Sequence, residues 1–473
     1  MGLLWGLALL AACAAPQGPE SCLTSSEDCP PGTFCDSLTQ RCVSDKLLES
    51  ERCRLPIDCP DAARPLCRDG LCTPCTNISD MAASDAACVA LGQPLLTTCV
   101  RSGPRKGQCG ECRQSGQCSD PGRPVCGDGL CRACEVHSDC AESGLCNDGS
   151  GLVDIPGVGV GQCAPVERVI FVNAEACPTP GSSATGSREK PFCELAAASG
   201  KGSYIVVAPR MAGTYAPAVF GDGKRTVIVG PGREGTAHLS SVTATGTRTA
   251  VVVVDAALTS SGAALSCGAG AGLSVERVAV HQSGIGVDAS GCDRVEISQT
   301  LIERGKGPAV RIAAGTRSYR IVNSQIFANV GPTAVQIGMG STGVFAQNTV
   351  INNGAMGSDG GAVSCEGVAT LTDSLFVQNG RSMRTDGMGN PLGTQFVGGC
   401  KLNNVVVGID AAAAGHMGFG AIPDLDNKLR LLSTPNNEAC CVDKALRCEG
   451  DFDYFGSPRK LGEGCELGAH ELR

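Results

Sequence analysis

Three residues in the second half of the chain carry side chains that can act together on a glycosidic bond. Glu276 and Glu296 are acids on consecutive strand-like segments, and Arg320 occupies the position of Glu296 one segment later. If the segments stack about 4.8 Å apart, the two carboxyl groups lie about 8 Å from each other, within the range that inverting glycosidases use for acid and base. These residues form a candidate catalytic set.

The same residues have a simpler explanation that needs no catalysis. A Glu and an Arg on neighbouring strands form an ion pair, which contributes under about 1 kcal/mol when it is exposed. The alignment places Phe345 in the same outward column, where its ring would offer a stacking face. We therefore expect Glu296, Arg320 and Phe345 to form a contact patch for a carbohydrate or a surface protein, with no catalytic residue.

One histidine and four other acids are weaker candidates for a catalytic or metal-binding role. His281 stands alone in its segment, and such a histidine is more often a surface or turn residue than a general base. The pairs Asp424/Asp426 and Asp451/Asp453 have oxygen ligands for calcium, but acids in loops are usually only solvated. We expect no cofactor, with calcium as the open alternative.

The candidate residues belong to a repeat of about 24 residues made of short apolar segments separated by Gly, Asn and Ser. Five copies align without gaps: LSVERVAV from Leu273, VEISQTLI from Val295, YRIVNSQI from Tyr319, VFAQNTVI from Val344 and ATLTDSLF from Ala369. Weaker copies begin near Tyr204, Thr226, Ala250 and Cys400. The repeat predicts about nine stacked coils.

The aligned copies predict which side chains face inward. One column reads Val275, Ile297, Ile321, Ala346 and Leu371, and a second reads Val280, Ile302, Ile326, Ile351 and Phe376. Between them, a bend is expected at Arg277, Gln299, Asn323, Asn348 and Asp373. Asn and Asp tolerate the left-handed backbone of a bend, so the positions are compatible with a coil that turns there.

This pattern resembles the pectate-lyase-like superfamily of right-handed parallel β-helices over about residues 167–473. The resemblance implies an all-β fold with an entry cap and a disulfide-bonded C-terminal cap. Many members cleave polysaccharides, but this chain has no Asn-Thr-Asp, Asp-Asp or Gly-His-Gly motif. A secreted polysaccharide lyase or glycoside hydrolase with an atypical site is therefore the alternative function.

The resemblance also suggests places for disulfides in the β-helix, although a sequence does not determine connectivity. Cys177 with Cys193 would pin the entry loop, and Cys267/Cys292 and Cys365/Cys400 would bridge nearby coils. The remaining cysteines of this region would bridge the C-terminal cap: Cys440, Cys441, Cys448 and Cys465.

The N-terminal part of the chain is dominated by cysteine, of which the whole chain has 31. A short unit at 14–50 precedes two eight-cysteine repeats at 51–163, in which RPLCRDGLCTPC recurs 59 residues later as RPVCGDGLCRAC. Such density indicates disulfides and an oxidising compartment, with zinc at the Cys-x-x-Cys pairs as the weaker alternative. The repeats resemble cysteine-rich modules of exported myxobacterial proteins, which implies a region of little secondary structure that acts as a spacer.

The first residues predict export. Leu3 to Ala12 form an apolar run of signal-peptide length, and Leu10-Ala11-Ala12-Cys13 resembles the lipobox of bacterial lipoproteins. This resemblance implies a signal peptide over 1–13, acylation of Cys13 and a membrane partner at the outer membrane or cell surface. Cleavage after Ala14 would give a secreted protein instead. The net charge of −9 argues against nucleic acid as a partner.

Taken together, these features predict a non-catalytic surface lipoprotein in which a disulfide-rich stalk carries a β-helix with a structural or adhesive role.

Overall fold

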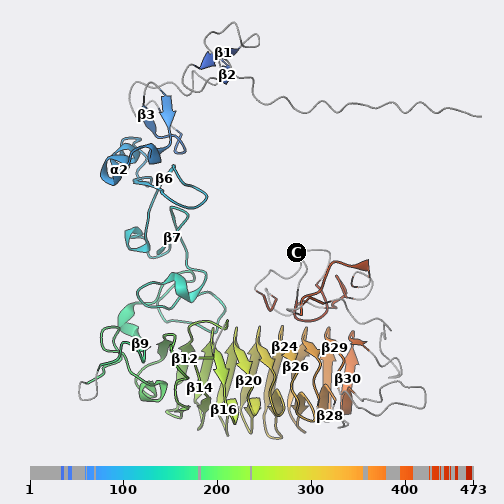
Figure 1. Cartoon of the computed structure of the whole chain (residues 1–473). Helices are drawn as coiled ribbons and strands as arrows, with labels where there is room; N and C mark the ends of the chain where they lie inside the picture. Colours follow the sequence, from blue (N-terminus) through green and yellow to red (C-terminus); the bar gives the residue numbers. More distant parts are fainter. Residues whose placement is uncertain are drawn as a thin grey trace, which may run out of the picture. The chain divides into compact units, whose positions relative to one another are not determined.

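The computed structural model divides the chain into two compact units, Met1–Ala133 and Cys134–Arg473, which are described separately (Figure 1). The structure describes residues 33–36, 41–44, 59, 61–68, 71–178, 183–234, 237–354, 361–379, 395–408, 425–426, 429–435, 437, 441–446, 448, 453–455 and 465–470. None of the helices among these residues is long and apolar enough to cross a membrane. The boundary after Ala133 falls inside the second eight-cysteine repeat.

The first unit consists of small antiparallel hairpins and short helices with little regular structure. The hairpins pair β1 (Thr33–Asp36) with β2 (Arg41–Ser44), β3 (Leu66–Arg68) with β4 (Leu71–Thr73), β5 (Thr98–Cys99) with β6 (Cys109–Gly110), and β7 (Val125–Gly127) with β8 (Leu130–Arg132). Among the residues of this unit that the structure describes, the helices are η3 (Cys75–Asn77), α2 (Met81–Val89) and η4 (Ser115–Gln117). The Asp80 side chain caps α2 by accepting a hydrogen bond from the N–H of Ala82.

Disulfides hold both cysteine repeats together in the same order. Among the described residues, the second cysteine of each repeat bonds to the fourth, the fifth to the seventh and the sixth to the eighth. The pairs are Cys59–Cys72, Cys75–Cys99 and Cys88–Cys109 in the first repeat and Cys118–Cys131, Cys134–Cys146 and Cys140–Cys163 in the second, which also has Cys112–Cys126. The equal connectivity supports the internal repeat seen in the sequence.

The second unit contains a parallel β-helix whose coils pass through three sheets in the order A, C, B. Sheet A contains β9 (Val169–Val172), β10 (Tyr204–Val207), β12 (Arg225–Val229), β14 (Ala250–Val254), β17 (Gly272–Glu276), β20 (Arg294–Ser298), β23 (Ser318–Val322) and β26 (Thr342–Ala346). Sheet C contains β15 (Ala257–Thr259), β18 (Ala279–His281), β21 (Leu301–Glu303), β24 (Gln325–Phe327), β27 (Thr349–Ile351), β29 (Leu375–Val377) and β31 (Val406–Gly408). Every strand pair in these sheets is parallel, as stacked coils require.

Sheet B completes the coil. It contains β11 (Ala218–Phe220), β13 (Val242–Ala244), β16 (Ala263–Cys267), β19 (Ile285–Ala289), β22 (Val310–Ile312) and β25 (Val335–Ile337). Two long strands, β28 (Val363–Thr372) and β30 (Phe396–Asn403), continue from sheet B into sheet A. The short helices η5 (His137–Asp139) and η6 (Val166–Arg168) precede β9, and η7 (Leu195–Ala198) lies between β9 and β10.

The core is a stack of aliphatic side chains in strand register. Val275, Ile297 and Ile321 lie on successive strands of sheet A in direct register and are at most 1% exposed. The same column continues through Phe345 and Leu371. The predicted all-β parallel β-helix is therefore confirmed, and its interior is a continuous apolar column rather than a set of separate cores.

The number of coils differs slightly from the prediction. Among the described residues, sheet C has seven strands, so about seven turns are complete instead of about nine. In the first coils, the chain passes along the position of sheet C in longer loops, where Leu239 makes isolated bridges to Tyr215 and Leu258 instead of belonging to a strand.

Left-handed residues flank both ends of the sheet C strands from β18 to β29. Arg277 and Gln299 turn the chain from sheet A into sheet C with φ of 53° and 48°, and Gln282 and Arg304 turn it out again with φ of 50° and 55°. The first bend was predicted at the right positions in four of the five copies. The fourth copy places Gln347 at the bend, with φ of 52°, instead of Asn348.

A ladder of buried amides runs beside the bend between sheets C and B. The Asn353 Oδ1 accepts hydrogen bonds from the backbone N–H and the side chain of Asn329, at 3.0 and 2.9 Å. The Asn353 Nδ2 donates to the carbonyl of Ile326 and to Asn379 Oδ1, each at 2.9 Å. These side chains satisfy backbone groups that the turning chain leaves without a strand partner.

We predict that Asn353→Ala lowers the free energy of unfolding by about 2–4 kcal/mol, because several buried donors and acceptors lose their partners. Chemical denaturation measures the change. The matched control is Asn352→Gly: Asn352 is exposed and has φ of 54°, which glycine adopts freely, so little change is expected there. Equal losses in both variants would show that the ladder does not stabilise the coil.

Candidate functional site

The outer wall of sheet A contains the candidate residues of the sequence analysis. Its two outward columns begin with apolar side chains on β10, β12 and β14, are polar on β17 and β20, and become apolar again on β26 with Val344 and Ala346. Glu276 is in register with Ser298, while Glu296 is in register with Ser274 and Arg320. The structure thus places Glu296 and Arg320 on neighbouring strands and Glu276 one strand earlier and two residues along, as the repeat predicted.

The apolar part of this wall is covered by the last part of the second cysteine repeat, residues 134–164, which we call the half-module. Leu145, Val153 and Ile155 of the half-module are at most 1% exposed. They form one apolar cluster with outward side chains of sheet A: Tyr204, Val227, Val229, Val252 and Val254. Polar contacts support the cluster, since Tyr204 Oη donates to the carbonyl of Asp154 at 2.6 Å.

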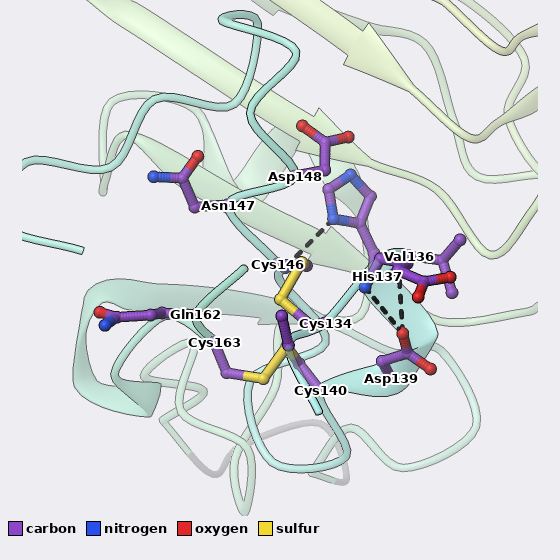
Figure 2. The surroundings of a disulfide bond; sticks show 12 residues. Cys134, Val136, His137, Asp139, Cys140, Cys146, Asn147, Asp148, Gln162 and Cys163 are labelled. Carbon is purple, nitrogen blue, oxygen red and sulfur yellow. Dashed lines mark hydrogen bonds between the residues drawn. A yellow bond between two sulfur atoms is a disulfide. The ribbon is translucent and has the colours of Figure 1, made fainter. Parts of the chain in front are cut away.

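A buried histidine lies at the edge of the half-module. His137 is 5% exposed, and its Nδ1 accepts a hydrogen bond from the N–H of Cys146 at 3.2 Å (Figure 2). This bond leaves the imidazole proton of the neutral form on Nε2, which lies 3.6 Å from Asp255 Oδ2. Figure 2 also shows Asp148 beside the ring and the two disulfides, Cys134–Cys146 and Cys140–Cys163, that hold the segment in place.

Arg277 connects the half-module to the β-helix. Its Nη2 lies 3.0 Å from Asp148 Oδ2 of the half-module, and its Nε lies 2.9 Å from Asp255 Oδ1 at the preceding bend. Its Nη1 pairs with the carboxylate of Glu276. We call these four residues and His137 the junction cluster: three acids, one guanidinium and one imidazole.

Burial changes the protonation of the junction cluster. Loss of solvent raises the pKa of Glu276 to about 7, against the opposing effect of Arg277. Burial also lowers the pKa of His137 below its usual value, although the charge of Asp255 opposes this. Burial alone would raise the pKa of Asp148, but the Ser150 N–H and Arg277 hold it below the usual value. A raised pKa is typical of catalytic acids, but here it results from the covering half-module.

The two candidate acids are both engaged by other side chains. Glu276 is 8% exposed and pairs with Arg277 beneath the half-module. Glu296 pairs with Arg294, and the hydroxyl of Ser274 donates to its Oε2 at 3.2 Å. In this arrangement the carboxyl groups do not face each other across an open groove, which an acid and base acting on a glycan would require.

The prediction that Phe345 lies in the outward patch is wrong. Phe345 is fully buried, in register with Ile321, and its ring stacks with that of Phe376 at 6.1 Å between centroids. The fourth repeat copy was aligned one residue too late, so Val344 stands outward beside Arg320 and Phe345 replaces Ala346 in the core. Burial of a phenyl ring in the core contributes far more than burial of a methyl group, and this sets the register.

The second inward column was shifted in the same way. Val350, not Ile351, lies in register with Ile326 and Phe376 on sheet C. Asn348 moves from the bend into a buried ladder, where its N–H donates to Ser374 Oγ at 3.1 Å and its Nδ2 donates to the carbonyl of Ile321 at 2.8 Å.

The sequence predicts that His281 stands alone, but in the structure it pairs with Glu303. It lies in register with Glu303 on the next strand of sheet C, with Nδ1 3.0 Å from Glu303 Oε1. This hydrogen bond lowers the pKa of the Glu303 carboxyl. The residues are 22 positions apart, which is also the offset between their repeat copies, so comparison of the outward columns of sheet C would have found the pair.

The predicted metal ligands are only partly described. The cysteines of the Cys-x-x-Cys pairs Cys72/Cys75, Cys109/Cys112 and Cys131/Cys134 each bond to a more distant cysteine, and sulfurs in disulfides do not bind zinc as thiolates. Asp424 and Asp451 lie outside the described residues. Asp426 Oδ2 pairs with Arg430 Nε at 2.6 Å, and Asp453 is fully buried.

Three further disulfides join the cysteines that the sequence analysis paired in the β-helix. They are Cys177–Cys193 in the entry loop and Cys267–Cys292 and Cys365–Cys400 between coils. In the C-terminal residues, Cys448 bonds to Cys465.

The last strands of the outer wall of sheet C are covered by these C-terminal residues. Leu375 and Val406 of sheet C form an apolar cluster with Leu431, Cys441 and Leu467. The Ala469 N–H donates to Thr349 Oγ1 at 3.0 Å. Arg233 lies 4.4 Å from the ring centre of Tyr454 and ties the segment to an early coil. The C-terminal residues thus lie along the side of the coils.

Sheet B presents an outward column that is at least partly exposed along its length, which we call the B wall. Its residues are in register across eight strands: Val219, Thr243, Ser266, Asp288, Arg311, Gln336, Ser364 and Val397. Arg311 Nε donates to Asp288 Oδ1 at 2.9 Å, and the hydroxyls of Thr243 and Ser266 lie 2.8 Å apart. The B wall is narrow, polar and hydrogen-bonding, with an exposed valine at each end.

We predict that Glu276→Gln stabilises the protein relative to the wild type increasingly as the pH rises from about 4.5 to about 7. Because the pKa of Glu276 is higher in the folded state than in the unfolded chain, its stabilisation is complete below about 4.5 and is lost as the pH rises through about 7. Each unit of pKa shift corresponds to about 1.4 kcal/mol. Denaturation of both proteins across this range measures the difference.

Glu296→Gln serves as the control, because Glu296 lies on the same wall outside the half-module. A stability difference between Glu276→Gln and the wild type that does not change with pH would contradict the assignment.

Residues 240–408 match the family model described as a right-handed beta helix region, which covers about a third of the chain. No curated protein and no solved structure matches the chain. The family match and the three parallel sheets together identify the coil as a right-handed parallel β-helix.

Proposed function

We propose that this chain is a non-catalytic protein of the bacterial cell surface, whose β-helix presents the B wall for structural or adhesive contacts. The observation that carries the proposal is that the outer walls of the three sheets differ in how far other segments of the chain cover them. The half-module covers the first strands of sheet A and the C-terminal residues cover the last strands of sheet C, whereas the side chains of the B wall are half-buried or exposed from its first strand to its last.

The state of the candidate acids supports a non-catalytic role. Glu276 contributes to the junction cluster and Glu296 to a pair with Arg294. Both carboxylates therefore have structural partners, and the stacking face expected from Phe345 belongs to the core. A contact surface needs none of these groups to be accessible, whereas glycan cleavage through this set requires two accessible carboxyl groups.

The half-module supports a role in display. Because it packs on sheet A through an apolar cluster and through Arg277, the chain enters the β-helix from a fixed surface. The disulfide-bonded repeats before it would then act as a spacer between a membrane anchor at Cys13 and the coils. Cys13 lies outside the described residues.

We predict that the purified chain cleaves none of a panel of uronic-acid and neutral glycans supplied with calcium. Release of reducing or unsaturated ends is the measurement, with Glu296→Gln and Glu276→Gln as paired variants. Cleavage by the wild type that either variant abolishes would overturn the non-catalytic function.

We also predict that Cys13→Ser releases the protein from the membrane fraction and removes labelled fatty acid, because serine lacks the thiol that is acylated. Fractionation of cells after labelling measures both. A wild-type protein found free in the medium without label would show secretion after cleavage at Ala14 instead.

A further inference from the structure

The side chains of the B wall are ordered so that the wall could pair with an identical wall that runs in the opposite direction. From the first coil to the last, the column contains a valine, two hydroxyl side chains, an acid, a base, an amide, a hydroxyl and a valine. The acid and the base are the fourth and fifth of eight positions, so the midpoint of the column lies between Asp288 and Arg311. A surface with this property suits contact with an identical surface turned by 180°.

Antiparallel contact of two B walls would match every position. With the two-fold axis between the Asp288 and Arg311 strands, Val219 of each copy meets Val397 of the other, Thr243 meets Ser364, and Ser266 meets Gln336. At the centre, each Asp288 meets the Arg311 of the second copy. The ends would bury valines that are 56% and 43% exposed in the single chain, and the intervening pairs are donors and acceptors of hydrogen bonds.

The charges of Asp288 and Arg311 favour antiparallel contact of the two walls over parallel contact. If the two walls met with their coils parallel, Asp288 would face Asp288 and Arg311 would face Arg311, and like charges at an interface are strongly unfavourable. In the antiparallel arrangement the four charges alternate in sign. The side chains of Asp288 and Arg311 are 16% and 40% exposed, so they can form new contacts while keeping their present pair.

The coils stack closely at the corner beside the B wall. Gly284, Gly307 and Gly331 follow one another on successive coils between sheets C and B. A Cβ at each would lie 2.3–2.4 Å from backbone atoms of the neighbouring coil, so no side chain fits there. The coils are therefore packed backbone to backbone at this corner.

We propose that the B wall binds a second copy of this chain, antiparallel, about a two-fold axis between the strands of Asp288 and Arg311. The inference rests on the proposed function in one respect, that the B wall is a contact surface. It names the partner of that surface as the same protein, on the same cell or on a neighbouring one.

The size of the B wall determines how tightly two copies are expected to bind. Seven intervals of about 4.8 Å make it about 34 Å long, and because each strand contributes at most about five residues to sheet B, it is about 17 Å wide. This area is below the roughly 800 Å² per partner of a typical stable complex. We therefore expect a dimer with a Kd on the order of micromolar or weaker, which high salt weakens because its centre is a charge contact.

Analytical ultracentrifugation of the full chain tests the proposal with two charge-reversal variants. Asp288→Arg places only positive charges at the centre, and Arg311→Asp only negative ones, so each variant alone is expected to be monomeric. An equal mixture of the two restores opposite charges across the axis and is expected to dimerise as the wild type does. Arg317→Asp is the matched control, because Arg317 lies on the turn into sheet A with an 83% exposed side chain; it should dimerise normally.

A photo-reactive amino acid in place of Val219 tests the register. The expected cross-link joins it to the strand of Val397 in the second copy. Thermal melting of every variant confirms that the coil is folded before association is compared.

Several results would overturn the proposal. They are a wild-type chain that stays monomeric at concentrations on the order of 1 mM, a dimer that neither charge reversal weakens, or a mixture that fails to associate although both variants are folded. These outcomes leave the proposed function intact, because it fails on a different result, glycan cleavage that depends on Glu276 or Glu296.

Discussion

The register between coils is the constraint on which the rest of this structure depends. In a parallel sheet successive side chains alternate between the core and the outer wall, so a shift of one residue exchanges the two sets completely. A slip at sheet A would bring Glu296 and Arg320 into the apolar interior and place Ile297 and Ile321 in solvent. The aliphatic column therefore determines the outer walls as well as the core, because every outward residue is fixed by its inward neighbours.

The left-handed bends and the buried ladders allow this register to persist through turns. A chain that leaves one sheet for the next loses regular strand partners for its backbone groups, and burial makes such groups costly. Asn329 and Asn353 supply the missing partners from side chains on successive coils. Coils of different length can then stack on one another, because the differences are confined to loops.

The half-module shows how an outer wall becomes part of the interior. Its apolar side chains turn the first strands of sheet A into a second buried layer, and Arg277 joins acids from both parts. Removing ion pairs from water offsets most of their attraction, so the apolar contact supplies the stabilisation and the junction cluster fixes the geometry. The C-terminal residues cover the last strands of sheet C in a similar way, and neither of these two apolar clusters includes an outward residue of sheet B.

Periodicity alone determined the β-helix, the inward columns at Val275 and Ile321, and the neighbouring positions of Glu296 and Arg320, because stacked coils repeat a local pattern at a nearly constant offset. The same pattern misplaced Phe345, since Asn348 was as good a bend residue as Gln347 and only the filling of the core distinguishes them.

Tertiary structure alone decided which walls are covered. The burial of Glu276, its pKa and its contact with Arg277 depend on the half-module, whose residues lie more than a hundred positions earlier. No spacing within the repeat contains that information, because the half-module and the coils meet through packing and charge contacts between segments that share no periodicity.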